Sequence, residues 1–398
     1  MRILQLTKKF PYPLKDGESI AVTNLSKSLH ALGCEITLLS MNTIKHYIDP
    51  STIPTSFDHY KKIHTVDLDN RVTVWGAFKN LFSKESYHVS RFYYQKYKEK
   101  LVELLRGEQY DVVQLETLYL APYIDSIRQY SNATIVMRSH NVEFEIWNRI
   151  ASNTGFLPKK IYLKYLAKKL ENFELNNLKH YDALVTVTQR DLDAYKKLGF
   201  RAKGIALPIG INCKEYFPGD ISNLPQSISF IGSLDWIPNL EGLNWFLEKV
   251  WPEVKQNNAD LKLHIAGRNT PQEIRNLADS SIVVEGEVDN AHSFLNSHLI
   301  TIVPLLSGSG MRVKILEGMA LARVVVSTSV GMEGIHAKNK EEILCADSPK
   351  DFAAVLNWIL KDIEVQHKIS SNARDFIADH FDVDTNAKRF LHFLQEIC

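Results

Sequence analysis

The sequence lacks three features that would mark a secreted or membrane-bound chain: clustered cysteines, a long apolar run and a signal peptide. Its four cysteines form no Cys-x-x-Cys pair, which argues against a disulfide framework or a zinc site and fits a reducing compartment. No run approaches the roughly 18 consecutive apolar residues of a membrane-spanning helix. The first residues, MRILQLT, alternate like a strand. We therefore predict a cytoplasmic protein. A location at the inner face of the membrane is compatible with this prediction. The cysteines are Cys34, Cys213, Cys345 and Cys398.

The chain also has almost no net charge. Its 47 lysines and arginines balance 46 aspartates and glutamates, for a formal charge of +1 at pH 7. Such a balance gives no general attraction for nucleic acid or for acidic membranes. We therefore expect no nucleic-acid partner, and a charged ligand must be met by a local patch.

Several catalytic motifs are absent as well. The sequence has neither a Walker A lysine motif nor GxGxxG, and no nucleophile elbow, so it does not support a hydrolase of the Ser/His/Asp type. Three Asp-x-Asp pairs occur, but none ends a predicted buried strand, as a metal-binding pair of a transferase should. We therefore predict no metal site. The pairs are Asp67–Asp69, Asp191–Asp193 and Asp382–Asp384.

What is present is the pattern of an ordinary α/β enzyme. With 398 residues, 45% of them hydrophobic and 23% charged, the chain can form two to three domains that each bury a core. Strand-like runs alternate with amphipathic stretches, which predicts parallel sheets built from βαβ units. We predict two facing, doubly wound Rossmann-like domains at residues 1–207 and 208–380. A C-terminal helix at 381–398 is expected to pack back on the first domain.

The predicted elements follow this pattern in both halves. Between the halves, the turn-rich stretch Phe217–Gln226 predicts a linker. The first half has predicted strands at Ile3–Leu6, Cys34–Ser40, Val72–Trp75, Val112–Leu115, Thr134–Arg138 and Ala183–Thr188, and helices at about Ser19–Leu32, Tyr87–Arg106 and Pro158–His180. The second half has predicted strands at Ser229–Ile231, Leu261–Ala266, Ile282–Val284, Leu299–Leu306 and Val324–Thr328, a helix at Leu240–Gln256, and a helical tail from Pro349 with a break near His380–Asp384.

The most informative stretch is LITIVPLLSGSGMRVKILEGMALARVVVSTSVGMEG, residues 299–334. A buried strand enters the glycine-containing loop Gly308–Gly310, and a helix with Arg312 and Lys314 in its first turns follows at once. Convergent backbone N–H groups, a helix N-terminus and two cations form a phosphate site. The carboxylate of Glu317 can accept hydrogen bonds from two sugar hydroxyls, so the stretch indicates a nucleotide site. The alternative is that this is one of the many strand–loop–helix units that bind no ligand.

The order of several motifs adds a family resemblance. FIGSLDWIPNLEGLNWF, LHIAGRN, VEGEV, PLLSGSGMRVKILEGMA and STSVGMEGI follow one another across about residues 228–335. This series resembles the retaining glycosyltransferases of GT-B architecture, specifically family four. The first half adds weaker similarities in PYPLKDGESIAVTNLSKSLHALGCEITLLS, YDVVQLE, RSHNVEFEIW, DALVTVTQRD and LPIGIN. The resemblance implies that a nucleotide sugar binds mainly to the second domain.

The resemblance also implies roles for single residues. Glu317 matches the second glutamate of the family's E-x7-E motif, which holds the ribose, whereas Ser309 stands at the first glutamate position. The loop FIGSLDWIPN lacks the Arg and Lys that many members use to hold the diphosphate. We therefore assign that positive charge to Arg312 and Lys314, where it would stabilise the leaving diphosphate.

His140 and Gly17 are predicted to contribute from the first domain. His140 follows a predicted strand, and a histidine at this landmark touches the donor sugar or its phosphate in the family. The alternative is a capping or core histidine hydrogen-bonded to backbone. Glycine at position 17 would let backbone amides approach the diphosphate. The predicted catalytic residues are His140, Arg312 and Lys314; the predicted donor-binding residues are Gly17, Gly232, Ser233, Gly308, Ser309, Gly310, Met311, Glu317 and Glu333.

The resemblance predicts a glycosyltransferase that moves a sugar from a nucleoside-diphosphate sugar to a hydroxyl of a saccharide or lipid-linked acceptor, in glycan or cell-surface polysaccharide synthesis. It implies retention of configuration, no metal and no cofactor, with UDP or GDP favoured as the nucleotide. Two alternatives remain: a nucleotide-sugar 2-epimerase of the same fold, and a non-catalytic nucleotide-sugar-binding partner subunit, which the departures at Ser309 and Ser233 allow. Lys160, Lys164 and Lys168 follow one face of a predicted amphipathic helix, which allows either peripheral membrane contact or simple packing on the sheet.

Overall fold

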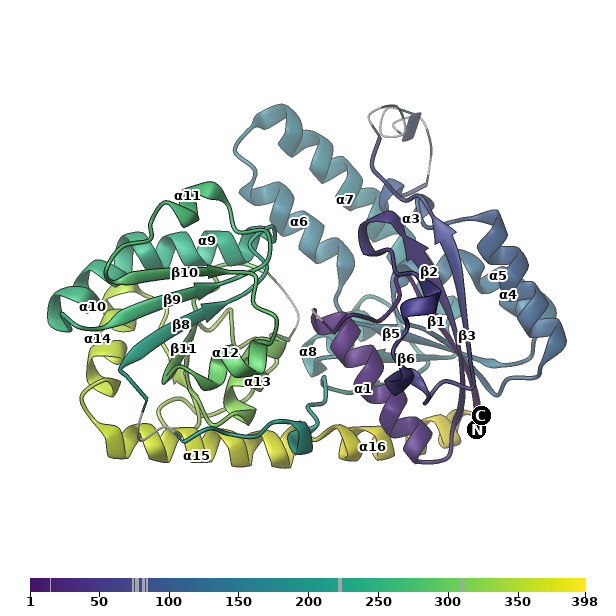
Figure 1. Cartoon of the computed structure of the whole chain (residues 1–398). Coiled ribbons are helices and arrows are strands. Elements are labelled where there is room, and N and C mark those ends of the chain that lie inside the picture. The colour runs from purple at the N-terminus through teal and green to yellow at the C-terminus, as the bar shows by residue number, and fades with distance from the viewer. Residues whose placement is uncertain are drawn as a thin grey trace. The chain divides into compact units, whose positions relative to one another are not determined.

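The computed structural model describes the chain except for residues 15, 74, 76–78, 81, 82, 84, 221–223, 309 and 310, and the side chain of Ser56. The described residues form two compact units, each built on one parallel sheet (Figure 1). The first unit comprises Met1–Gly210 with Asp384–Cys398, and the second comprises Ile211–Val383. The predicted α/β class is thereby confirmed. Within the part of the chain that the structure describes, no helix is both long and apolar enough to cross a membrane.

The sheet of the first unit has seven strands in the order β3-β2-β1-β4-β5-β6-β7. Successive residues of a strand point to opposite faces, and both faces are buried: Ile3 belongs to the apolar cluster on one face and Leu4 to the cluster on the other. The strands are β1 (Arg2–Thr7), β2 (Glu35–Thr43), β3 (Lys62–Leu68), β4 (Val112–Leu115), β5 (Thr134–Ser139), β6 (Ala183–Thr186) and β7 (Lys203–Ala206).

Helices cover both faces of this sheet, and the last helix of the chain is one of them. Ala387, Phe390 and Leu394 of that helix, α16, are fully buried in the same cluster as Ile3 and Leu29. The helices are α1 (Gly17–Ala31), α3 (Tyr87–Ser90), α4 (Gln95–Gly107), α5 (Ile124–Tyr130), α6 (Glu143–Asn153), α7 (Leu157–Asn177), α8 (Gln189–Lys197) and α16 (Val383–Ile397). Short 3₁₀ helices lie at Ile44–His46, Pro50–Thr52, Thr55–Phe57, Leu118–Tyr123 and Leu178–His180.

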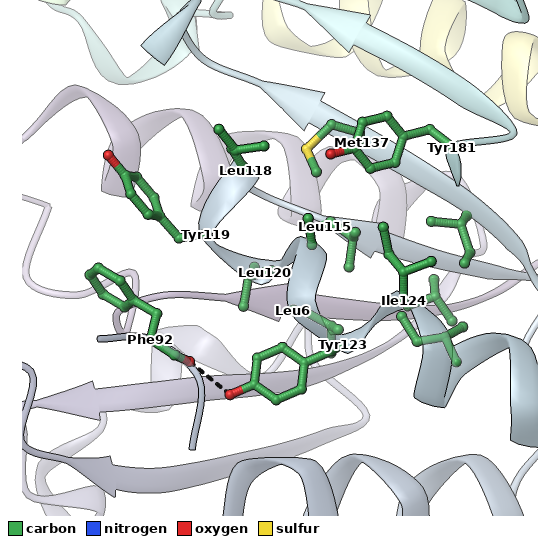
Figure 2. Packing of buried hydrophobic residues seen from close by; sticks show 14 of the residues in the cluster. Leu6, Phe92, Leu115, Leu118, Tyr119, Leu120, Tyr123, Ile124, Met137 and Tyr181 are labelled. Carbon is green, nitrogen blue, oxygen red and sulfur yellow. Dashed lines mark hydrogen bonds between the residues drawn. The ribbon is translucent and has the colours of Figure 1, made fainter. Parts of the chain in front are cut away.

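The cluster on the other face contains buried tyrosines as well as aliphatic residues. Figure 2 shows Leu6, Leu115, Ile124 and Tyr123 packed together, with the Tyr123 hydroxyl directed at a backbone carbonyl. That hydroxyl donates to the carbonyl oxygen of Phe92 over 2.7 Å. A buried phenol needs such a partner, so the ring can fill the core without leaving a polar group unsatisfied.

The second unit repeats the doubly wound plan with six parallel strands in the order β10-β9-β8-β11-β12-β13. The strands are β8 (Ser227–Ile231), β9 (Lys262–Ala266), β10 (Ile282–Gly286), β11 (Ile300–Val303), β12 (Val324–Ser327) and β13 (Leu344–Cys345). The helices are α9 (Ile237–Trp245), a π-helical turn (Phe246–Val250), α10 (Trp251–Asn257), α11 (Gln272–Arg275), α12 (Ala291–Asn296), α13 (Val313–Ala320), α14 (Pro349–Ile359) and α15 (Ile363–His380), with a 3₁₀ turn at Cys213–Glu215.

Both sheets have a topological switch point. The strand order reverses between β1 and β4 in the first unit and between β8 and β11 in the second. Loops that leave neighbouring strands in opposite directions there open a crevice at the carboxyl ends of the strands, where ligands of such sheets bind. A ligand site is therefore expected at the residues after β1 and β4 and at those after β8 and β11.

Most predicted elements are confirmed, but the third strand is not where we expected it. Val72 and Thr73 have no regular structure and Trp75 is helical, while Val74 lies outside the described residues. The strand lies earlier, as β3, which pairs with β2 at the edge of the sheet. Its side chains are mostly half-buried and polar, so the apolar alternation that identifies a strand is weak. The sequence prediction also missed α6 and β7, and the predicted helix 87–106 is interrupted between α3 and α4.

The stretch predicted as a linker, Phe217–Gln226, lies inside the second unit. The carbonyl oxygen of Gly219 accepts from Nη2 of the buried Arg323 over 2.6 Å, and its N–H donates to Oδ1 of Asn296 over 3.2 Å. Turn residues therefore mark a surface loop bound to its own unit, and the prediction of a linker there was wrong. Residues 221–223 of this stretch lie outside the described residues.

The basic helix singled out in the sequence is α7, which lies beside α6 (Figure 1). Leu166 and Leu170 are buried, as the packing interpretation expects. At the start of the helix, however, Phe156, Leu157 and Ile161 have 69%, 64% and 61% of their surface exposed. The exposed apolar surface of this helix therefore lies at its beginning, whereas Leu166 and Leu170 are part of the core.

Candidate functional site

The loop between β11 and α13 follows the switch point of the second unit. Gly308 has a φ of +113°, and a Cβ at this position would lie 2.9 Å from Nη2 of Arg312 and 3.3 Å from the Trp236 ring. Glycine is required here for both reasons. The buried guanidinium of Arg312 lies 5.6 Å from the centroid of the Trp236 ring, within the range of a cation–π contact. The loop from β11 thus packs against the loop from β8 around a cation.

Lys314, on α13, contacts the end of β8 and the start of α9. Its Nζ donates to Oδ1 of Asn239 over 2.8 Å and to the carbonyl oxygen of Ile231 over 3.3 Å. A Cβ on Gly232 would lie 2.8 Å from Nδ2 of Asn239 and 3.1 Å from Nζ of Lys314, so glycine admits the ammonium beside the backbone. Burial, and then the neighbouring charge of Arg312, lower the pKa of Lys314 to about 7. Gly232, a predicted donor-binding residue, and Lys314, a predicted catalytic residue, are therefore neighbours.

A further cation reaches this edge that sequence reasoning missed. Arg268 follows β9, and its Nη2 donates to Oγ of Ser233 over 3.4 Å. The carbonyl oxygen of Arg268 accepts from the N–H of Leu234 over 2.9 Å. Ser233 also donates to the carboxylate of Asp235. Arg268 lies two residues after the predicted strand Leu261–Ala266, but only the sheet makes this strand the neighbour of β8. The loop after β8 lacks cations of its own but gains one from the next strand.

Glu317, the predicted ribose ligand, lies on α13 with 9% of its surface exposed. Its Oε1 accepts from the hydroxyl of Tyr216 over 3.2 Å and lies 3.7 Å from Nε2 of His292. The rings of Tyr216 and His292 are 4.2 Å apart between centroids, and Arg374 donates to the carbonyl oxygen of Tyr216 over 3.0 Å. Burial and the charge of Glu317 raise the pKa of Tyr216 well above its ordinary value, so the phenol stays a donor that fixes the carboxylate.

Of the remaining predicted donor-site residues of this unit, the structure describes only some. Met311 is buried. Glu333 is half-buried in the turn after β12, where its N–H donates to the carbonyl oxygen of Val330 over 3.4 Å. Ser309 and Gly310 lie outside the described residues. The charged side chains whose contacts bear on a donor site in this unit are thus Arg312, Lys314 and Glu317.

The switch point of the first unit has a buried polar centre that the sequence analysis did not single out. Glu116, with 0% of its surface exposed, directly follows β4. It accepts from Nε2 of Gln5 over 2.6 Å, Nη1 of Arg138 over 2.9 Å and Nε2 of His140 over 3.2 Å, and also from Gln114. Burial alone would raise the pKa of Glu116, but Arg138 and then His140 hold it at about 2. A buried carboxylate that is ionised near neutral pH therefore organises this edge.

His140 thus has a side-chain partner, Glu116, whereas the alternative of a capping or core histidine predicted a backbone partner. The bond to Glu116 fixes which ring nitrogen faces the interior. Burial would raise the pKa of Glu18, but Lys8, Lys9 and His140 hold it below its ordinary value. His140 and the start of α1 therefore lie on the same edge of the first unit, as the prediction for His140 and Gly17 requires.

Gly17 is the first residue of α1, but its surroundings are less simple than predicted. The preceding Asp16 caps the helix by accepting from the N–H of Ser19 over 3.0 Å, and Lys9 donates to the same carboxylate over 2.7 Å. The next residue, Glu18, is also acidic. Backbone amides at Gly17 are therefore bordered by two carboxylates, which makes this helix start a weaker anion site than glycine alone suggested.

Comparison with known proteins found a family match that lies within the second unit. Residues 225–362 match the model of the family described as glycosyl transferases group 1. A Klebsiella pneumoniae protein described as an uncharacterized 44.6 kDa protein in the cps region is 26% identical over 398 residues, covering 96% of each chain.

Solved structures match over the whole chain. Sucrose-phosphate synthase from Thermosynechococcus elongatus has a TM-score of 0.72 at 17% identity, covering 100% of this chain and 99% of that one. Anabaena HepE in complex with UDP has a TM-score of 0.66 at 13% identity, covering 100% of both chains. These likenesses confirm the GT-B-type, two-unit fold that the sequence resemblance implied.

Proposed function

We propose that this protein is a glycosyltransferase, because residues 225–362 match the family described as glycosyl transferases group 1. It transfers a sugar from a nucleoside-diphosphate sugar to a hydroxyl of a saccharide or lipid-linked acceptor. The donor binds to the second unit at the switch point between β8 and β11. The anomeric configuration is retained, and no metal is needed.

One observation carries this proposal: the cations and the carboxylate that a nucleotide sugar requires lie on a single short helix and the residue before it. Arg312 is the N-cap of α13, and Lys314 and Glu317 lie on the helix. Arg312 and Lys314 lie at the two loops of the switch point, where a diphosphate would meet them, and Arg268 adds a third cation nearby. These side chains would neutralise the leaving diphosphate, which in other transferases is the task of a metal ion.

Glu317 is held for the ribose. With Oε1 fixed by Tyr216 and His292, the carboxylate is oriented before the nucleotide arrives, which lowers the entropy cost of binding. UDP is the first nucleotide to test, because the structure of Anabaena HepE is a complex with UDP.

The acceptor side of the proposal rests on a relative and on one exposed surface. The Klebsiella relative comes from a cps region, which favours polysaccharide synthesis. The exposed residues Phe156, Leu157 and Ile161 at the start of α7, beside Lys159 and Lys160, would suit peripheral contact with an anionic membrane surface on the cytoplasmic side. That contact would bring a lipid-linked acceptor to the enzyme.

The donor site is tested by thermal stabilisation of the Glu317→Gln variant. Wild-type protein should be stabilised by one nucleotide class among UDP, GDP, ADP, CMP and dTDP and their sugar conjugates. Glu317→Gln should bind that ligand at least about tenfold more weakly, because charge-assisted hydrogen bonds to the ribose are worth about 1.5–3 kcal/mol. The amide keeps an acceptor for Tyr216, so the fold should survive.

The matched control is Glu341→Gln, a largely exposed glutamate of the same unit, which should leave nucleotide binding unchanged. Equal stabilisation of wild type and Glu317→Gln would remove the ribose from this site. Stabilisation by no nucleotide at all, in a protein that melts cooperatively, would favour the non-catalytic partner subunit.

Nucleotide-sugar affinity should rise as the pH falls from 8.5 to 6. Because the pKa of unliganded Lys314 is about 7 and a diphosphate favours the ammonium, binding takes up a proton below pH 8.5. The expected gain is about tenfold over this range. Calorimetric titration with UDP-glucose is suitable, since its diphosphate is esterified at both ends and does not titrate in this range. Lys314→Arg stays charged throughout and should abolish the pH dependence; the same slope in this variant would refute the assignment to Lys314.

A further inference from the structure

The first unit contains a pocket of about 400 Å³ that the donor site does not use. It lies at the carboxyl ends of β1, β2 and β3, on one side of the switch point. Its cationic lining residues come from four separate parts of the chain: Lys8 and Lys9 after β1, Lys45 after β2, Arg71 after β3, and Arg91 at the end of α3. Since these residues are far apart in the sequence, only the fold gathers them into one basic pocket.

The positive charge of this basic pocket is only partly neutralised. Glu18 lines the pocket and lies 3.2 Å from Lys8 and 3.7 Å from Lys9. Asp16 binds Lys9 over 2.7 Å, and Asp69 binds Arg71 over 2.7 Å. Glu143 also interacts electrostatically with Lys8, so carboxylates offset part of the positive charge, and the described groups still include more cations than carboxylates.

Arg91 is the cation best placed to meet a ligand. Its Nη1 donates to the carbonyl oxygen of Asn70 over 2.8 Å and its Nε to that of Tyr87 over 3.3 Å, and no described carboxylate forms an ion pair with it. Its guanidinium lies 5.6 Å from the ring centroid of Tyr87 and 5.7 Å from that of Phe92. Backbone carbonyls and rings thus position this charge without cancelling it.

His46 lies in the electrostatic field of these cations. His46 also lines the basic pocket, and burial and the charge of Lys9 lower its pKa. Burial is the largest cause, Lys9 and Lys45 add repulsion, and Asp16 and Glu18 oppose that repulsion. A ligand that brings negative charge would relieve this repulsion.

We propose that the basic pocket binds a phosphate or diphosphate group of the acceptor. A phosphate or diphosphate brings more negative charge and more acceptor oxygens to these cations than a carboxylate does. The several oxygens of such a group can also accept from Arg91, the lysines and Asn70 at the same time. That the phosphorylated molecule is the acceptor rests on the proposed function, which assigns the donor diphosphate to the second unit; the anion site itself does not.

The test is calorimetric binding of inorganic pyrophosphate to the full chain, in the Lys314→Gln background so that the donor site is weakened. We expect measurable binding that falls at least tenfold in Arg91→Gln and recovers in part in Arg91→Lys. The matched control is Arg106→Gln, because Arg106 is another arginine of the same unit over a tyrosine ring, at 4.5 Å from Tyr130. It should change nothing, whereas an equal loss in both variants would show general charge attraction and overturn the proposal.

The source of the phosphate is separated by two further ligands, glucose 1-phosphate and farnesyl diphosphate. Tighter Arg91-dependent binding of the first supports a soluble phosphorylated saccharide, and tighter binding of the second supports a lipid-linked acceptor. Glucuronate that binds as well as pyrophosphate, or pyrophosphate binding insensitive to Arg91→Gln, would overturn the assignment. If this site fails while UDP-glucose still binds in a Glu317-dependent way, the proposed transferase activity is unaffected.

Discussion

Replacing Lys314 by Ala is expected to lower kcat for sugar transfer by about 100-fold to 1,000-fold, the usual cost of removing one charge-stabilising donor from an active site. The reason is its position, with Nζ between Asn239 and the carbonyl oxygen of Ile231 at the switch point. As the bond from sugar to diphosphate breaks, negative charge grows on the leaving oxygen. A fixed ammonium there stabilises the transition state more than the bound donor.

The measurement is the initial rate of nucleoside diphosphate release from the donor, with acceptor or by slow hydrolysis without it. Lys314→Arg should retain part of the activity, because it keeps the charge but not the geometry. The matched control, Lys338→Ala, removes a largely exposed lysine of the same unit and should have no effect. A variant with unchanged kcat and a higher KM would show that Lys314 binds the ground state and transition state alike.

Replacing Glu116 by Ala is expected to destabilise the first unit by about 3–5 kcal/mol, because it leaves a buried charge without its partner. Arg138, with 2% of its surface exposed, would lose its carboxylate, and Gln5 and His140 would each lose an acceptor. Urea unfolding followed by fluorescence measures the change, with separate transitions fitted for the two units, since a two-unit chain need not unfold in one step.

Two comparisons make this prediction specific to the buried charge. Glu103→Ala breaks a surface pair with Lys100 and should cost less than about 1 kcal/mol. The double variant Glu116→Ala with Arg138→Met should recover much of the loss, because no charge is then left unpaired. A loss in Glu116→Ala no larger than in Glu103→Ala would mean that solvent replaces the carboxylate.

The same pair predicts how acid acts on the first unit. The folded-state pKa of Glu116, about 2, lies below its ordinary value of 4.5. Unfolded chains therefore bind the proton more readily, so the stabilisation is complete above about pH 4.5 and is lost as the pH falls toward 2.

Much of the fold could be predicted from the sequence because its signals are local. β4 was predicted with the bounds it has, and β1, β5 and β9 within a residue or two at each end, since buried parallel strands are continuous β-branched and aliphatic runs. β3 was missed because an edge strand with half-buried polar residues has no such run. The turn-rich stretch Phe217–Gln226 was misjudged because turn residues identify a loop but not which unit the loop contacts.

For the candidate site, too, some residues could be predicted from the sequence and others could not. The sequence indicated Arg312, Lys314 and Glu317, because a strand, a glycine loop and a helix start are adjacent along the chain. It could not indicate Arg268 as a neighbour of Ser233, since β9 and β8 become neighbours only in the sheet.

By itself, then, the sequence determined the α/β class, the repeated βαβ plan and the helix that carries the proposed donor-site side chains, because these depend on residues close together in the chain. Only the tertiary structure decided which charges meet. Glu116 is ionised because Arg138 and His140 come from the next strand and its loop, and the basic pocket exists because three strands end at one edge. Charge–charge energies depend on distance and burial, and neither quantity can be obtained from the order of residues before the sheet is formed.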